Sequence, residues 1–347
     1  MFNFTSFAFP NSGPHWQAQG TSFAGISGGR TSGLMAACLD PTIKLLFENT
    51  GREHPRTYDF LTALDEALGN RIVWLEYVKP IKKGDAPKNA RFQIVNYKTA
   101  DRTGAPFRAF METLAEFRET KGLPPVAPWA RGRLCTAQMK HKTGERYIKS
   151  LGIDVFTMFV GLRADEPTRV HDLKKEESQR VDFRCPLFDV GIKKQDVLDF
   201  WSRQSFDLEI QEYQGNCDGC FLKDQSDLSR SLGEMDDPEF WFAMEEYPRF
   251  GGADFVGYRQ LRDEYEMRLE IEQKLKALYF DGSTTATKQP IDKQVFSTLQ
   301  NSMLAQQAFK TQKRMLNVIR QEKRRVLHGP VGFSCSCEAS FNLPDEV

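Results

Sequence analysis

Short apolar runs alternate with amphipathic stretches through the first half of the chain. Four runs have the length and composition of buried strands, namely Thr21–Ile26, Ile43–Asn49, Ile72–Val78 and Val155–Val160. Helical periodicity occurs in the segments Thr31–Leu39, Pro55–Leu68 and 106–119. Strands that alternate with helices imply right-handed crossovers and a parallel sheet covered on both faces. We therefore predict an α/β fold with a Rossmann-like, doubly wound parallel sheet.

This alternation is interrupted once and later gives way to a helical pattern. Residues 80–104 are basic and weakly periodic, with one short candidate strand at Phe92–Tyr97, and we expect a solvated loop or flap there. From Pro238 onward the chain turns helical, and amphipathic segments occur at Phe240–Met244, Phe255–Tyr279 and Asp292–Leu327. We predict three regions: an N-terminal arm at 1–20, the α/β domain at 21–235, and a helical region with a cysteine-containing tail at 236–347.

Composition narrows the class of protein. The chain of 347 residues is 40% hydrophobic and has no net charge, so any attraction to nucleic acid has to come from a local excess of charge. It has no run of about 18 apolar residues and no basic start followed by an apolar stretch. We therefore expect no membrane span, no secretory signal and a cytoplasmic location.

One local excess of charge lies near the end of the chain. The segment from Lys288 to Arg325 contains nine Lys or Arg residues and two Asp or Glu residues. A basic helix over 288–325 could contact the phosphates of a nucleic acid along one face. A solvated face, or pairing with the acidic helix before it, explains the same pattern, and these alternatives stay open.

A turn of small residues follows the first predicted strand and leads directly into a helix. Its sequence is Ser27-Gly28-Gly29-Arg30-Thr31-Ser32. The glycines let backbone N–H groups approach a ligand, and the helix start offers unpaired donors and the positive end of its dipole. Arg30 adds a positive charge. The sequence matches neither the Walker pattern nor Gly-x-Gly-x-x-Gly. We predict a phosphate-binding loop, with a flexible serine-glycine loop as the alternative.

Two further segments follow predicted strands on the same side of the sheet. Asn49, Thr50 and Gly51 end the second strand, and Arg163 follows the strand at Val155–Val160. In open α/β sheets, ligands bind outside the carboxyl ends of the strands, where the strand order reverses. The planar charge of an arginine suits a phosphate, although an ion pair of Arg163 with a neighbouring carboxylate is an alternative.

Together these segments resemble the motifs of the phosphoadenosine phosphosulfate (PAPS) reductase family, within the PP-loop or ATP pyrophosphatase superfamily. The loop resembles Ser-Gly-Gly-x-Asp-Ser, Phe47–Pro55 resembles the family's second motif, and Gly161–Glu166 resembles its Gly-x-Arg-x-x-Glu element. The resemblance covers roughly residues 20–230. It implies the PP-loop fold and catalytic roles for Arg30, Ser32 and Arg163. It also implies nucleotide contacts at Ser27, Gly28, Gly29, Arg30, Thr31, Ser32, Asn49, Thr50, Gly51, Lys140 and Arg163.

The resemblance also implies a reaction. ATP pyrophosphatases cleave ATP between the α- and β-phosphates, so we expect AMP or an adenylylated intermediate plus pyrophosphate, used in sulfur transfer or nucleic-acid modification. A redox or sulfur-donor protein is the expected partner. The Ser-Gly-Gly form of the loop favours ATP over PAPS. Thr31 replaces the usual Asp, a candidate Mg²⁺ contact, which leaves Asp165 or Glu166 as substitutes. Two alternatives stay open: a true reductase of PAPS or adenylyl sulfate, and a nucleic-acid-binding protein with a vestigial nucleotide site.

Seven cysteines, an odd number, indicate metal or redox chemistry rather than a disulfide framework. Cys217 and Cys220 form a Cys-x-x-Cys pair, and Cys135 and Cys185 lie on separate connections of the predicted sheet. Four thiolates suit a tetrahedral Zn²⁺ or a [4Fe-4S] cluster, and because two of the ligands are isolated we predict the cluster. Ordinary buried thiols beside a lone redox pair are the alternative. The candidates for a sulfur carrier or resolving thiol in the tail are Cys335 and Cys337.

Overall fold

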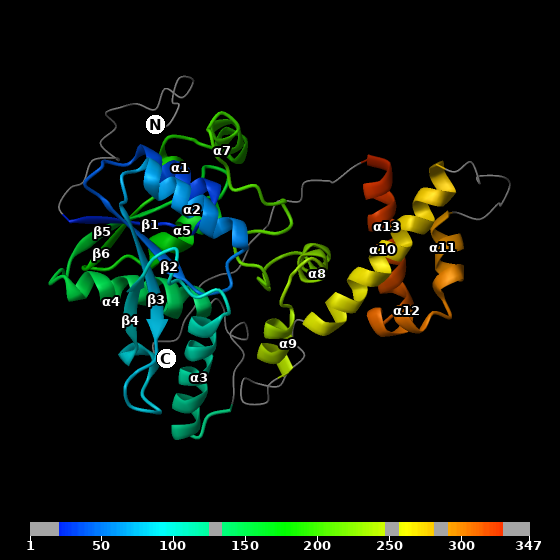
Figure 1. The fold of residues 1–347 in the computed structure, drawn as a ribbon, viewed down its shortest axis with the longest axis horizontal. Helices are drawn as coiled ribbons and strands as arrows, with labels where there is room; N and C mark the ends of the chain where they lie inside the picture. The colour runs from blue at the N-terminus through cyan, green and yellow to red at the C-terminus, as the bar shows by residue number, and fades with distance from the viewer. Residues whose placement is uncertain (1–20, 125–133, 247–256, 281–290, 329–347) are drawn as a thin grey trace.

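The computed structural model describes residues 21–124, 134–246, 257–280 and 291–328. Within these residues, six strands form one sheet in the order β4-β3-β2-β1-β5-β6 (Figure 1). The strands are β1 Ser22–Gly25, β2 Lys44–Asn49, β3 Ile72–Val78, β4 Arg91–Val95, β5 Phe156–Val160 and β6 Val181–Arg184. Every neighbouring pair is parallel except β3 with β4.

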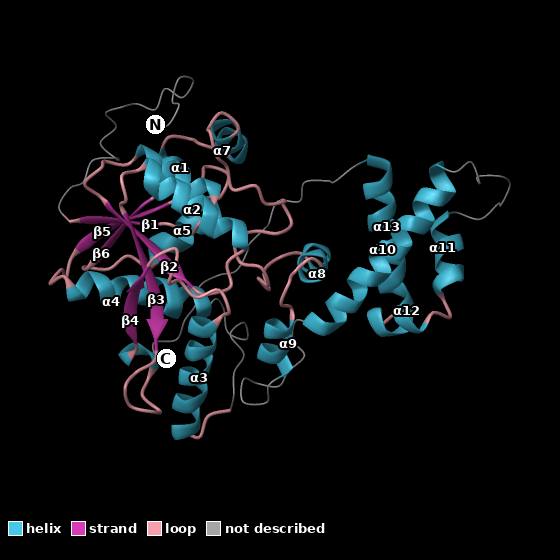
Figure 2. Ribbon diagram, viewed as in Figure 1, coloured by secondary structure: helices cyan, strands magenta, loops and turns pink. Residues whose placement is uncertain are grey.

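Helices cover both faces of the sheet (Figure 2). The helices of the α/β part, up to residue 201, are α1 Arg30–Cys38, α2 Pro55–Ala67, α3 Ala105–Thr120, α4 Lys142–Ser150, α5 Pro167–Lys175, α6 Pro186–Asp189 and α7 Lys194–Trp201, with the short helices η1 Pro87–Asn89 and η2 Cys135–His141. Ala24 and Phe47 pack against α1, α2 and α7, whereas Phe23 and Leu46 pack against α4. Because side chains alternate along a strand, adjacent apolar residues fill two different cores. The predicted doubly wound α/β fold is confirmed.

The predicted elements of the first half lie within two residues of the observed ones. The candidate strand at Phe92–Tyr97 exists as β4, but it belongs to the main sheet as an antiparallel edge strand. The connection between β3 and β4 contains only the short helix η1, whereas a crossover to a parallel neighbour usually carries a full α-helix. The pattern did not predict β6, because Val181–Arg184 is a half-buried edge strand without a continuous apolar run.

The second part of the chain is helical. Its helices are α8 Gln225–Gly233, α9 Glu239–Glu246, α10 Tyr258–Phe280, α11 Ile291–Leu299, α12 Met303–Ala308 and α13 Gln312–His328. The predicted single segment Asp292–Leu327 is therefore three helices. The hydroxyl of Ser302 accepts the N–H of Ala305 at 3.4 Å and so caps the start of α12. Met267 and Ile271 of α10 share a core with Ile319 of α13.

One hydrophobic core crosses residue 235, the predicted domain boundary. Phe107 and Phe110 of α3 share this core with Trp241 of α9 and Tyr258 of α10. The rings of Phe107 and Trp241 lie edge to face, with their centroids 5.5 Å apart. The first helices of the C-terminal region thus pack directly on the α/β part, and the boundary itself stays a prediction. No helix in the described ranges is both long and apolar enough to cross a membrane.

A buried network of charges joins α8, α10 and α13. Glu264, Arg268 and Glu322 are each no more than 3% exposed. Arg268 donates to Glu264 at 2.9 Å and to Glu322 at 2.8 Å. Arg230 of α8 donates to Glu322 at 2.8 Å, and Arg314 of α13 donates to Glu264 at 2.7 Å. A buried charge without a partner is strongly unfavourable, so the loss of one member of this network should destabilise the contacts among these helices.

Replacing Glu322 with Ala should lower the free energy of unfolding by about 3–5 kcal/mol, because Arg268 and Arg230 then lose a buried partner. The matched control is Arg320→Ala, since Arg320 is 59% exposed in its pair with Asp292. This control should change the free energy of unfolding by less than about 1 kcal/mol. Urea denaturation followed by circular dichroism measures both. Equal effects of the two substitutions would contradict a special role for the buried network.

Candidate functional site

The turn from β1 into α1 has the shape expected of a phosphate-binding loop. Gly28 has a φ of +82°, and a Cβ at this position would lie 2.4 Å from Cγ2 of Thr57, so only glycine fits. Gly29 is the N-cap residue of α1, and no side chain caps this helix start. The first N–H groups of α1 are therefore donors that an anion can use.

The three hydroxyl groups of the loop, on Ser27, Thr31 and Ser32, differ in their contacts and exposure. The Oγ atoms of Ser27 and Ser32 are 3.2 Å apart, and buried Ser32 donates to the carbonyl oxygen of Gly29 at 3.0 Å. Thr31 accepts a hydrogen bond from Nη1 of Arg163 at 3.3 Å. Ser27 is exposed. Ser32 thus stabilises the turn from within, whereas Ser27 faces solvent.

Arg30 is engaged by a carboxylate. Its Nε and Nη2 donate to the two carboxylate oxygens of Asp207 at 2.6 and 2.8 Å. The indole of Trp201 also donates to the carbonyl oxygen of Arg30 at 2.8 Å. Asp207 therefore pairs with the positive charge of Arg30, and the catalytic role and nucleotide contact of Arg30 stay predictions. No local pattern indicates this pair, because 177 positions separate its members.

Arg163 lies beside the loop, at the end of β5. β1 has β2 on one side and β5 on the other, so the loops after β1 and β5 flank the point where the strand order reverses. A Cβ on Gly161 would lie 2.9 Å from Cα of Ser32, so the two segments are in close contact. Arg163 also pairs with Asp165 at 2.8 Å and with Glu166 at 3.3 Å. Arg163 therefore lies beside the loop, as predicted, and it also forms the ion pairs of the alternative explanation.

The loop after β2 is held by its own polar groups. The side-chain amide of Asn49 donates to Glu76 at 2.7 Å, and its oxygen accepts the N–H of Gly51 at 3.1 Å. The hydroxyl of Thr50 donates to Glu53 at 2.9 Å. Asn49, Thr50 and Gly51 are all buried. These residues therefore shape the loop, and their contact with a nucleotide stays a prediction.

The predicted metal ligands do not come together as a set of four. The thiol of Cys220, hydrogen-bonded to that of Cys217, and burial together raise the pKa of Cys217. Burial and then Cys220 raise the pKa of Cys135, so these three thiols are neighbours. Cys185 is instead buried beside Leu162, at the end of edge strand β6. In the described parts of the chain, no three or more His, Cys, Asp or Glu side chains are positioned to hold a metal ion.

This separation has a topological reason. The three neighbouring thiols lie by the loop after β2, whereas β6 is on the far side of β1 and β5 in the sheet. The predicted convergence of Cys185 on the other three is therefore not observed, and the cluster itself stays a prediction. Cys335 and Cys337 lie outside the described residues.

The helix η2 is a π-helix that carries both Cys135 and Lys140. A π-helix joins residues i and i+5, which is the separation of these two residues. Nζ of Lys140 lies 3.6 Å from the carboxylate of Glu53. Burial acts to lower the pKa of Lys140, but Glu53 and the thiols of Cys217 and Cys135 outweigh it and raise the pKa. Lys140 is therefore a charged neighbour of the thiols, and its contact with a nucleotide stays a prediction.

The segment before the Cys-x-x-Cys pair is joined to the loop after β2 by backbone hydrogen bonds. Cys217 forms an antiparallel bridge with Glu53, and the N–H of His54 donates to the carbonyl oxygen of Asn216 at 2.7 Å. The side-chain amide of Asn216 donates to the carbonyl oxygen of Ser27 at 3.0 Å. The loops after β1 and β2 and the cysteine pair thus form one connected unit.

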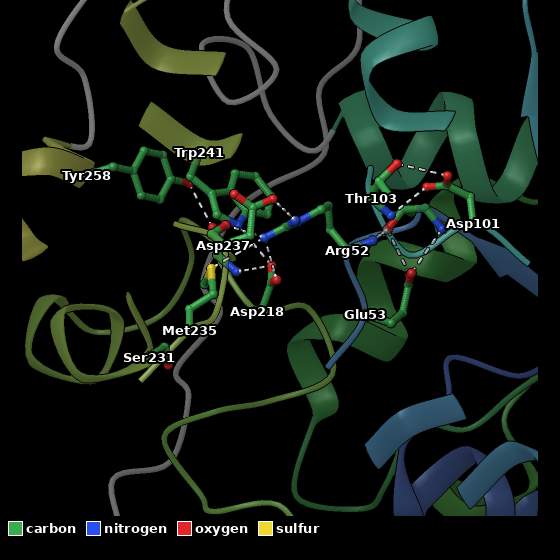
Figure 3. Close-up of polar contacts among 12 residues, drawn as sticks. Arg52, Glu53, Asp101, Thr103, Asp218, Ser231, Met235, Asp237, Trp241 and Tyr258 are labelled. Atoms are coloured by element: carbon green, nitrogen blue, oxygen red, sulfur yellow. Dashed lines mark hydrogen bonds and ion pairs between the residues drawn. The ribbon is translucent and has the colours of Figure 1, made fainter. Parts of the chain in front are cut away.

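Arg52 is the buried charge that holds this unit to the helical region (Figure 3). Its guanidinium lies 2.9 Å from the carboxylate of Asp218. The indole of Trp241 donates to Asp218 at 2.9 Å, and the hydroxyl of Tyr258 donates to the carbonyl oxygen of Gly219 at 2.7 Å. Sequence reasoning missed these roles. The only local signal was an Asp between the two cysteines, and its partners lie far away in the chain.

The basic segment near the C-terminus is partly neutralised by neighbouring helices. Three of its arginines form ion pairs: Arg314 with Glu264, Arg320 with Asp292, and Arg325 with Glu322. The alternative of pairing with the preceding helix is observed for Arg314, whereas Arg320 and Arg325 pair with acidic residues of the basic segment itself. Lys313 and Arg324 are exposed on α13. Contact with nucleic acid stays a prediction.

Known proteins resemble this chain in sequence and in fold. No family model matches this chain. The chain is similar to the "uncharacterized nin region protein ORF290" of Escherichia phage lambda, with 27% identity over 228 residues, or 60% of this chain and 72% of that protein. The fold is similar to a crystal structure of phosphoadenylyl-sulfate (PAPS) reductase from Candida auris in a phosphate complex. Identity there is 16%, coverage is 52% of this chain and 71% of that chain, and the TM-score is 0.30. A score this low supports no conclusion about the site.

Glu48, on β2, is a further titratable group near Lys140. Its Oε1 atom lies 2.6 Å from the position that a Cβ on Gly144 would take, so α4 packs closely on it. Burial raises the pKa of Glu48 to about 8, although the charge of Lys140 opposes this rise. The folded protein therefore holds a proton on Glu48 over a pH range in which the unfolded chain has released it.

Replacing Glu48 with Gln should increase stability relative to the wild type as the pH rises. The pKa is raised on folding, from 4.5 to about 8, so ionisation disfavours the folded state between these values. The gain should be absent below about pH 4.5, grow up to about pH 8 and then stay constant. Urea denaturation at several pH values measures it. A difference that does not vary with pH would contradict the raised pKa.

Proposed function

We propose that this protein is a PAPS reductase-like PP-loop enzyme that binds an adenine nucleotide, preferably ATP, with its phosphates at the loop between β1 and α1. One observation carries the proposal: this loop and Arg163 meet where the strand order reverses, with Nη1 of Arg163 3.3 Å from the hydroxyl of Thr31. The positive φ of Gly28 and the uncapped start of α1 support it. The unpaired N–H groups at such a helix start favour a bound anion.

The proposed reaction is cleavage of ATP between its α- and β-phosphates. It yields AMP or an adenylylated intermediate and releases pyrophosphate, and the activated product serves sulfur transfer or nucleic-acid modification. Negative charge develops on the leaving pyrophosphate, and N–H groups already fixed by the fold stabilise that charge without rearrangement. Arg163 contributes by exchanging its present carboxylate partners for phosphate oxygens.

The side chains expected to hold metals fit that task poorly. The carboxylates of Asp165 and Glu166, the expected substitutes at a Mg²⁺ site, are both engaged by Arg163. A [4Fe-4S] cluster or structural Zn²⁺ held by four cysteines needs thiolates that converge, and Cys185 lies apart from the other three. We therefore assign no step of the reaction to a metal.

Two other functions are compatible with the same loop and differ from the proposal in their products. A reductase of PAPS or adenylyl sulfate releases sulfite and requires a redox partner. A nucleic-acid-binding protein with a vestigial nucleotide site releases neither sulfite nor pyrophosphate. The uncapped helix start and the position of Arg163 favour a working nucleotide site over a vestigial one.

The variant Arg163→Lys should weaken ATP binding by about tenfold or more, because lysine keeps the charge but loses the bidentate fork. Isothermal titration calorimetry measures the change. The matched control is Arg169→Lys on α5, since Arg169 is 43% exposed and pairs with Glu166. This control should bind ATP as the wild type does. Equal ATP affinity of Arg163→Lys and wild type would contradict the proposed site.

A further inference from the structure

Asn216 connects two loops that lie 189 positions apart in the chain. Its side-chain amide donates to the carbonyl oxygen of Ser27 at 3.0 Å. The same nitrogen lies 2.7 Å from the position that a Cβ on Gly29 would occupy. Asn216 therefore touches the phosphate-binding loop on both sides of Gly28, and the next residue in the chain is Cys217.

The other end of the cysteine loop is held by different groups. Arg52 pairs with Asp218, and Nζ of Lys223 donates to the carbonyl oxygen of Asp218 at 2.6 Å. Tyr258 donates to the carbonyl oxygen of Gly219. These contacts come from the loop after β2, the cysteine loop itself and α10. The contacts of Asn216 with Ser27 and Gly29 tie this loop to the turn after β1.

We propose that Asn216 is a positioning residue that couples the phosphate-binding loop to the Cys217–Cys220 pair, so that bound nucleotide lowers the reactivity of these thiols. The inference rests on the proposed function. With Asn216 withdrawn, the carbonyl oxygen of Ser27 loses its donor and Gly29 loses its neighbour, so the turn can leave the conformation that binds phosphate. ATP therefore binds better when Asn216 keeps its contacts with Ser27 and Gly29. By linkage, bound ATP stabilises these contacts and opposes opening of the cysteine loop.

The thiols provide a direct readout of this opening. Cys217 and Cys220 are half-buried, and their thiols hydrogen-bond each other. Alkylation requires a thiolate that a reagent can reach, so local opening of the loop should accelerate it. Cys185 is 2% exposed and lies elsewhere in the fold. Its alkylation therefore reports global unfolding in the same sample.

The test uses the full-length protein and the variant Asn216→Asp, which keeps the side-chain shape but replaces the donor NH₂ group with a carboxylate oxygen. The control is Gln211→Glu, the same change of amide to carboxylate at an exposed side chain five positions earlier. Iodoacetamide is the probe, mass spectrometry follows each cysteine separately, and ATP is added at a saturating concentration. Calorimetry measures ATP binding to the same preparations.

Without nucleotide, Asn216→Asp should accelerate alkylation of Cys217 and Cys220 by roughly fivefold, the effect on a local opening equilibrium of losing about one hydrogen bond. The alkylation rate of Cys185 in Asn216→Asp should equal that in the wild type. In the Gln211→Glu control, Cys217 and Cys220 should also react at the wild-type rates. ATP should slow alkylation of the pair in the wild type and have no effect in Asn216→Asp.

Equal alkylation rates in wild type and Asn216→Asp without nucleotide would overturn the inference. ATP that binds to the wild type but leaves its alkylation rates unchanged would overturn the coupling and leave the proposed function standing. Absence of ATP binding to the wild type would instead remove the proposed function, and the coupling with it.

Discussion

The parallel pairing of β1 with both β2 and β5 determines where the loops of this protein meet. Strands in a sheet lie about 4.8 Å apart, so the turns that follow three adjacent strands have to touch. This explains why small residues line the contacts. Gly28 lies against Thr57 and Gly161 lies against Ser32, in both cases at distances that leave no room for a Cβ. The turn between β1 and α1 is therefore shaped by its neighbours on both sides.

Buried charge then connects this edge of the sheet to the helical region. Arg52 is 4% exposed and is stable there because the carboxylate of Asp218 pairs with it and the ring of Phe240 lies 4.5 Å from its guanidinium carbon. Burial raises the pKa of Asp218, and Arg52 opposes that rise. Trp241 and Tyr258 bring α9 and α10 to the same loop. The position of the cysteine pair thus depends on both parts of the chain.

The features that the sequence predicts well are those with a local signal. The strands that deliver Gly28 and Arg163 are continuous apolar runs, and their order along the chain implies which sheet edge they share. The features that it misses are pairs formed across long separations. Arg30 with Asp207 and Arg52 with Asp218 need a known arrangement of loops before either partner can be named. The separation of Cys185 from the other thiols could not be predicted, because the sequence pattern gives no sign of β6, the edge strand that precedes it.

The most direct test of the account is to incubate the purified protein separately with ATP, PAPS and adenylyl sulfate and to measure pyrophosphate and sulfite. A nucleotide loop that cleaves between the α- and β-phosphates predicts pyrophosphate from ATP and no sulfite from either sulfated nucleotide. Sulfite from PAPS or adenylyl sulfate would contradict the proposed reaction in favour of a reductase. Neither product under any condition would contradict an enzymatic role for the loop.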